Sequence, residues 1–311
     1  MKREENTVDN RMEQLRRCTL CPRECGAERL SGKKGRCHVA DEILVARAAL
    51  HMWEEPCISG QEGSGAVFFS GCSLGCVFCQ NREISGGESG RAITIERLSE
   101  IFLELQAQHA NNINLVTAGH YIVQTCRALE LARQKGLSIP IVYNSSGYEK
   151  KETLKMLDGL VDIYLPDFKY MQPETARAYS RAADYPDVAR QALEEMVRQC
   201  PRPVFDSRGM MQSGVIVRHL LLPGHVREAK EIIRYLYETY GDRIYISMMN
   251  QYTPGEAVKG DPLLGRRVTR REYARLLDFA EQIGVTQGFY QEGQTASESF
   301  IPPFDCSGVL N

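Results

Sequence analysis

Three cysteines, Cys72, Cys76 and Cys79, lie within eight residues of one another. Three thiols at this spacing can surround one compact iron–sulfur cluster, whereas a structural zinc ion usually takes four protein ligands. Three thiolates therefore favour a [4Fe-4S] cluster with one open iron, to which a further ligand can bind. Gly71 and Gly75 allow the chain to turn sharply around such a cluster. Buried or unrelated cysteines are the alternative, and the tight spacing argues against it.

The elements that must position these thiols form an alternating pattern. Short apolar runs of the kind that become buried parallel strands occur at 66–71, 113–117, 139–144, 161–166, 215–222, 243–248 and, more weakly, 285–290. Between them lie helical stretches at 95–105, 121–134, 151–157, 173–199, 227–240 and 270–283.

Such alternation predicts an α/β fold with a parallel sheet. The pattern alone does not decide between a full barrel, an incomplete barrel and an open doubly wound sheet. In each of these architectures the site lies at the carboxyl ends of the strands. The three thiols directly follow the first apolar run, which places them at that edge.

Composition narrows the function classes. The chain has 311 residues, a formal net charge of -2 and a pI of about 6.3, which gives no global electrostatic case for nucleic acid or an anionic membrane. No signal peptide and no membrane-spanning apolar run are visible, so we expect a cytoplasmic protein. In that compartment, eleven cysteines predict metal ligands, catalytic thiols or buried residues in preference to disulfides.

The Cys-x3-Cys-x2-Cys spacing, with Phe78 before the last cysteine, resembles the signature of radical S-adenosylmethionine (SAM) enzymes. The resemblance implies that Cys72, Cys76 and Cys79 ligate three irons of a [4Fe-4S] cluster and that the fourth iron binds SAM. Reductive cleavage of SAM then yields a 5′-deoxyadenosyl radical, which abstracts a hydrogen atom. It also implies that Phe78 contacts the adenine. We expect an incomplete (β/α)6 barrel with the cluster and SAM at its top.

Segments 141–148, 164–169 and 217–224 are similar to those that line the SAM pocket in the group related to pyruvate formate-lyase activating enzyme. This similarity implies SAM contacts, or a monovalent cation beside SAM, at Asn144, Ser145, Asp167 and Lys169. Arg218 would bind SAM or a substrate carboxylate. Residues two apart on a strand share a face, so Asp167 and Lys169 can bind the polar ends of a zwitterion; a structural ion pair is the alternative.

One segment departs from the superfamily pattern. Most members have a Gly-Gly-Glu sequence that binds the SAM amino group, and this chain has Thr-Ala-Gly-His at 117–120. Gly119 keeps the glycine and is a candidate SAM contact. His120 can replace the acid, face the substrate or serve a structural role.

Residues 1–60 form a cysteine-rich extension before the barrel region, 61–311. Cys18, Cys21, Cys25 and Cys37 can hold zinc as a structural knuckle or an auxiliary iron–sulfur cluster. The segment has too few apolar residues to fold without such support. Spacing alone leaves the metal open.

The resemblance implies reduced flavodoxin or ferredoxin as electron donor. Three functions are then possible for the protein. The protein can activate a glycyl radical enzyme by abstracting hydrogen from a backbone glycine. It can instead act on a small molecule. The third possibility is a binding protein: a metal-binding adaptor whose barrel has no catalytic activity. Salt-dependent binding to nucleic acid would support it.

Overall fold

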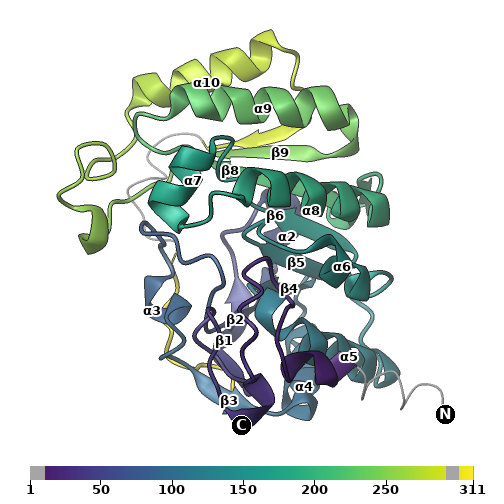
Figure 1. The fold of residues 1–311 in the computed structure, drawn as a ribbon. Helices are drawn as coiled ribbons and strands as arrows, with labels where there is room; N and C mark the ends of the chain where they lie inside the picture. The colour runs from purple at the N-terminus through teal and green to yellow at the C-terminus, as the bar shows by residue number, and fades with distance from the viewer. Residues whose placement is uncertain (1–10, 292–300, 311) are drawn as a thin grey trace.

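The computed structural model describes residues 11–291 and 301–310. Its centre is one sheet with the strand order β10-β9-β8-β6-β5-β4-β2-β1-β3 (Figure 1). The strands are β1 (Ile43–His51), β2 (Ser64–Phe69), β3 (Arg91–Ile93), β4 (Ile113–Val116), β5 (Ile141–Ser145), β6 (Ile163–Pro166), β8 (Met211–Leu220), β9 (Tyr245–Met249) and β10 (Gly288–Tyr290). The short β7 (Val204–Phe205) pairs with β8 outside this path.

From β2 to β10 every neighbouring pair on the path is parallel. The seven apolar runs of the sequence all become these strands, and β2, β4, β5 and β6 are buried along their whole length. Continuous burial explains why they are apolar on both faces. The described sheet thus has seven parallel strands, one more than the six we expected, and its path ends at β10 and β3 without closing into a barrel.

Three antiparallel strands, β1, β3 and the short β7, were not predicted. β1 pairs with β2, and β3 pairs with β1. β1 begins inside the segment that we assigned to the cysteine-rich extension, so residues 43–51 belong to the main sheet. Its side chains alternate between buried and half-buried positions over part of its length, which is the pattern of an antiparallel strand near a sheet edge.

Helices connect the parallel strands. They are α4 (Ile95–Ala107), α5 (Ile122–Gln134), α6 (Lys151–Leu154), α7 (Pro173–Ser180), α8 (Tyr185–Gln199), α9 (Val226–Tyr240) and α10 (Arg270–Gln282), with one-turn helices α2 (Pro56–Ser59) and α3 (Arg82–Ser85). Figure 1 shows α4 and α5 at one end of the sheet and α9 and α10 at the other. The Thr94 hydroxyl accepts a hydrogen bond from the Arg97 amide and caps α4.

The predicted helical stretch 173–199 is two helices. The chain turns at Arg181, whose φ of +50° is left-handed and ends α7. The break matters for the site, because it points the end of α7 at the cysteine loop. No helix in the described ranges is long and apolar enough to cross a membrane.

Candidate active site

The loop that follows β2 carries the three thiols. Gly71 has a φ of +92°, and a Cβ there would lie 2.6 Å from the Cys37 carbonyl oxygen. Only glycine satisfies both the left-handed backbone and this close approach. The Cys72 amide donates to the same carbonyl at 3.2 Å. The N-terminal segment therefore fixes the start of the loop.

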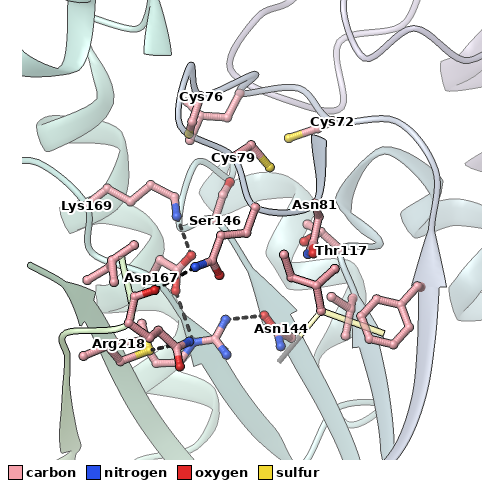
Figure 2. Close-up of a pocket in the computed structure, with 18 of the residues that line it drawn as sticks. Cys72, Cys76, Cys79, Asn81, Thr117, Asn144, Ser146, Asp167, Lys169 and Arg218 are labelled. Carbon is pink, nitrogen blue, oxygen red and sulfur yellow. Dashed lines mark hydrogen bonds and ion pairs between the residues drawn. The ribbon is translucent and has the colours of Figure 1, made fainter. Parts of the chain in front are cut away.

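Cys72, Cys76 and Cys79 line a cavity of about 230 Å³ at the carboxyl ends of the parallel strands. Figure 2 shows the loop with its sulfurs on one side of this cavity and polar side chains on the other. These polar groups come from three consecutive strands of the sheet: Asn144 at the end of β5, Asp167 and Lys169 just after β6, and Arg218 on β8.

Asp167 joins the two cations of this set. Its carboxylate accepts a hydrogen bond from Lys169 Nζ at 2.5 Å and one from Arg218 Nε at 3.1 Å. Arg218 Nη2 also donates to Asn144 Oδ1 at 2.6 Å. The four groups therefore form one continuous network on the cavity wall.

The acidic and basic side chains of this network stay ionised although they are buried. Burial alone would raise the pKa of Asp167, but Lys169 and Arg218 outweigh it and lower that pKa. Burial disfavours the charged forms of Lys169 and Arg218, and the neighbouring carboxylates reverse the effect and raise both pKa values. The cavity wall thus presents an ionised carboxylate between two cations at neutral pH.

Glu54, which our reading of the sequence missed, completes the network. Its carboxylate accepts from Arg218 Nη1 at 3.1 Å and from Asn114 Nδ2 at 3.0 Å. Asn144 Nδ2 donates to it at 3.3 Å. Glu54 lies three positions after the end of β1, so the unpredicted strand is what brings it to the cavity. The mostly apolar run 43–50 was the available local signal for this strand.

A match to the Radical SAM superfamily covers residues 66–236, more than half of the chain. The chain belongs to this superfamily. An uncharacterized protein of Methanocaldococcus jannaschii is 27% identical over 278 residues, which make up 87% of this chain and 76% of that protein.

Solved structures of SuiB from Streptococcus suis are also similar. In complex with the precursor peptide SuiA the identity is 14% and the TM-score 0.47, covering 71% of this chain and 46% of SuiB. Bound to S-adenosylmethionine the values are 13% and 0.48, covering 71% and 48%. The chain therefore spans about half the length of SuiB. The finer resemblance to pyruvate formate-lyase activating enzyme stays a prediction.

Membership of the radical SAM superfamily implies a [4Fe-4S] cluster and SAM. Three thiols on one loop facing one cavity are a suitable donor set for the cluster. No three Cys, His, Asp or Glu side chains in the described ranges already stand in ligating geometry, so these thiols must draw together. Burial raises the pKa of the Cys79 thiol to about 12, and the ligands therefore lose protons when the cluster is bound.

Phe78, the radical SAM residue expected to contact adenine, lines the cavity within an aromatic cluster. Its ring meets Tyr170, Tyr179 and Tyr252 edge to face, at centroid distances of 6.1–6.4 Å. Ser180, the last residue of α7, donates a hydrogen bond to Cys76 Sγ at 3.0 Å. The end of α7 thus supports both the loop and the aromatic wall.

Ser145 and Gly119 lie outside the cavity lining. The Ser145 hydroxyl is buried and accepts from the Gly147 amide at 3.1 Å, whereas its neighbour Ser146 lines the cavity. A Cβ on Gly119 would come within 2.7 Å of the Glu149 carboxylate, so a packing contact accounts for this glycine.

Of the roles considered for His120, namely replacing the acid, facing the substrate or supporting the structure, the last fits its surroundings. Its side chain is buried, and its Nε2 lies 2.8 Å from the Ser70 carbonyl oxygen. Burial lowers its pKa to about 4. The neutral ring therefore donates this bond and holds the 117–120 turn beside the strand that carries the thiols. Thr117, from the same turn, lines the cavity.

The rim of the cavity includes residues that no motif indicated. Trp53, Ile301 and Pro302 line it. The last two come from the described C-terminal segment, which runs along β1 through the bonds of Cys306 N to Ala46 O and Ala48 N to Ser307 O. The four N-terminal cysteines do not line this cavity.

Proposed function

We propose that this radical SAM enzyme cleaves SAM reductively and uses the 5′-deoxyadenosyl radical to abstract a hydrogen atom from a polypeptide, with the backbone glycine of a glycyl radical enzyme as the first target. One observation carries the proposal: three loop thiols face a buried, charged wall across a single cavity. The thiols suit a cluster and the wall suits a zwitterion.

The bound cluster and SAM supply the chemistry, in which one electron breaks the bond between sulfur and C5′ and leaves methionine and the radical. The chain supplies binding and orientation. Lys169 is placed to pair with the SAM carboxylate, and Asp167 with its ammonium group or with a monovalent cation. Arg218 fixes the Asp167 carboxylate through its 3.1 Å hydrogen bond. Phe78 presents its ring to the adenine.

Water exclusion protects such a radical. The side chains of Asp167, Lys169 and Arg218 are 15–18% exposed, and the aromatic cluster around Phe78 closes the cavity on the α7 side. We propose reduced flavodoxin or ferredoxin as the one-electron donor.

The rim favours a polypeptide substrate. Trp53 is 61% exposed and Ile301 37% exposed, and both line the cavity. Met52, beside Trp53 in the chain, is 43% exposed. Large exposed apolar side chains around a site are typical of surfaces that bind a macromolecule. A small-molecule substrate remains the second candidate, because the cavity is partly enclosed.

Deuterium transfer tests the proposal. The reconstituted, reduced enzyme is incubated with SAM and a glycyl radical enzyme from the same genome, produced with dideuterated glycine. Deuterium in the 5′-deoxyadenosine and a glycyl radical signal in electron paramagnetic resonance would support it. Formation of 5′-deoxyadenosine without deuterium refutes the glycine target and directs the search to small molecules. No 5′-deoxyadenosine would point to an idle barrel.

A further inference from the structure

The N-terminal segment gathers four thiols away from the active-site cavity. We propose that Cys18, Cys21, Cys25 and Cys37 form a second metal site, which holds a structural zinc ion. The ion takes no direct part in the chemistry at the cavity, and it stabilises the segment that supports the cysteine loop.

Backbone contacts bring the four cysteines together. The Cys18 amide donates to the Ala27 carbonyl, and the Gly26 amide donates back to the Cys18 carbonyl, both at 3.0 Å. At Gly35, a Cβ would lie 3.3 Å from Cys25 Sγ and 3.5 Å from Cys37 Sγ. The chain thus folds back on itself, and the Cys37 thiol lies close enough to Cys18 and Cys25 to interact with both electrostatically.

The chain adopts strained backbone to do so. Glu24, before Cys25, has a φ of +40°, and His38, after Cys37, has a φ of +68°. Non-glycine residues take this left-handed conformation at an energetic cost. The backbone amides of Arg23 and Val39 face the sulfurs of Cys21 and Cys37, two residues earlier in each case. Amides in this position stabilise a thiolate.

A buried arginine supplies the strongest argument. Arg29 has no exposed surface, and no salt bridge among the described residues includes it. Its Nη1 lies 3.8 Å from Cys18 Sγ, and its Nε and Nη1 donate to main-chain carbonyls. Its Nη2 has no hydrogen-bond partner in the part of the chain that the structure describes.

A buried cation needs a counter-charge. Neutral thiols do not provide one. Four thiolates around a divalent ion carry a net charge of about -2, which places the missing anion beside the Arg29 guanidinium. The metal site therefore explains a charge that the described protein atoms leave unbalanced.

The ligand set favours zinc. Four protein thiolates close a tetrahedral coordination sphere, as in structural zinc sites, and leave no position open to substrate. In its described structure, the segment from residue 13 to 42 contains only the 3-10 turns Glu13–Leu15 and Arg29–Ser31. So little regular structure is typical of a module that a metal ion holds together.

The thiols are not yet in ligating geometry. The same is true of the cysteine loop, which belongs to a superfamily that binds its cluster there. We therefore expect the ligands of both sites to move inward when the metal binds.

This site connects to the cysteine loop through the backbone. The Cys37 carbonyl accepts the Cys72 amide at 3.2 Å. Arg23, between the second and third cysteines, donates to the carbonyls of Ser73 at 3.0 Å, Leu74 at 3.2 Å and Ser180 at 2.9 Å. Zinc at the four thiols would thus hold the loop in place for its own cluster.

Metal analysis of the full-length chain tests the proposal. The protein is purified anaerobically, and zinc, iron and acid-labile sulfide are measured for the native chain and three variants. We expect about one zinc per chain. Cys25→Ser, at an exposed position, loses zinc; Cys76→Ser loses iron and keeps zinc; Cys306→Ser, a half-buried cysteine outside both sets, keeps both.

Cobalt provides a second measurement that does not depend on the folding of Cys25→Ser. Cobalt(II) alone is added to the metal-free Cys76→Ser chain, whose four N-terminal cysteines are intact. The absorption bands of a tetrahedral cobalt–thiolate site would support the proposal. The absence of these bands, or an unchanged zinc content in Cys25→Ser, overturns the proposal. Iron with sulfide retained in Cys76→Ser would show an iron–sulfur cluster and overturn zinc.

Discussion

Two adjacent glutamates allow a sharp test of the charge network. Glu54 accepts hydrogen bonds from Arg218, Asn114 and Asn144, and its side chain is 9% exposed. Removing one partner of a buried ion pair costs roughly 3–5 kcal/mol. In Glu54→Gln, Asp167 still neutralises Arg218 and the amide keeps part of the bonding. We therefore expect a loss of about 2–3 kcal/mol in the free energy of unfolding.

Glu55 is the matched control, since it has the same side chain one position on. It is 8% exposed, its Oε2 has no hydrogen-bond partner among the described residues, and burial raises its pKa. Its charged form is therefore unfavourable. Glu55→Gln removes this cost, and we expect a change within about 0.5 kcal/mol of zero or a gain in stability.

The assay is urea unfolding of the metal-free, full-length chain at pH 7 without oxygen, followed by circular dichroism. We compare the native chain with Glu54→Gln and Glu55→Gln. If the free energy of unfolding depends on urea concentration with the same slope in all three, a difference in urea midpoint reports a difference in stability. Equal midpoints for the two variants, or a larger loss for Glu55→Gln, would refute the assignment of Glu54 as a stabilising counter-charge of Arg218.

Three further predictions concern the site and its support. Lys169→Met removes the partner of the SAM carboxylate and should weaken SAM binding to the reconstituted protein about 30-fold by equilibrium dialysis; an unchanged affinity contradicts that role. Arg23→Gln frees four main-chain carbonyls of the cysteine loop and the end of α7, so a chelator should remove the loop's iron several-fold faster, and an unaltered rate would exclude this support. Burial lowers the pKa of His120 from 6.5 to about 4, so its contribution is present above pH 6.5 and is lost as the pH falls through 4. Between pH 7 and 4, the free energy of unfolding of His120→Gln should fall by about 3 kcal/mol less than that of the native chain. Parallel pH profiles for the variant and the native chain would argue against the buried neutral ring.

Local pattern predicted much of the fold. Each buried parallel strand is a continuous apolar run, which is visible without knowledge of its neighbours. The cap at Thr94 and the cysteine loop are also local. The position of the loop after β2 follows from chain order alone. Chain order therefore predicted that the thiols lie at the carboxyl ends of the parallel strands.

Long-range pairing was less accessible. β1 lies in a cysteine-rich segment, and nothing local shows that it pairs with β2 and carries Glu54 to the cavity. The choice between Ser145 and Ser146 depends on how the chain turns after β5. One of the two counter-charges of Arg218 likewise comes from a residue 164 positions away, which no local pattern can indicate.

Detection of 5′-deoxyadenosine tests the central claim most directly. The native chain is reconstituted with iron and sulfide, reduced with dithionite in the presence of SAM, and analysed by chromatography beside Cys76→Ala. We expect a reducible cluster and 5′-deoxyadenosine from the native chain, and no 5′-deoxyadenosine from the variant. A native chain that binds no cluster, or equal product from Cys76→Ala, would contradict it.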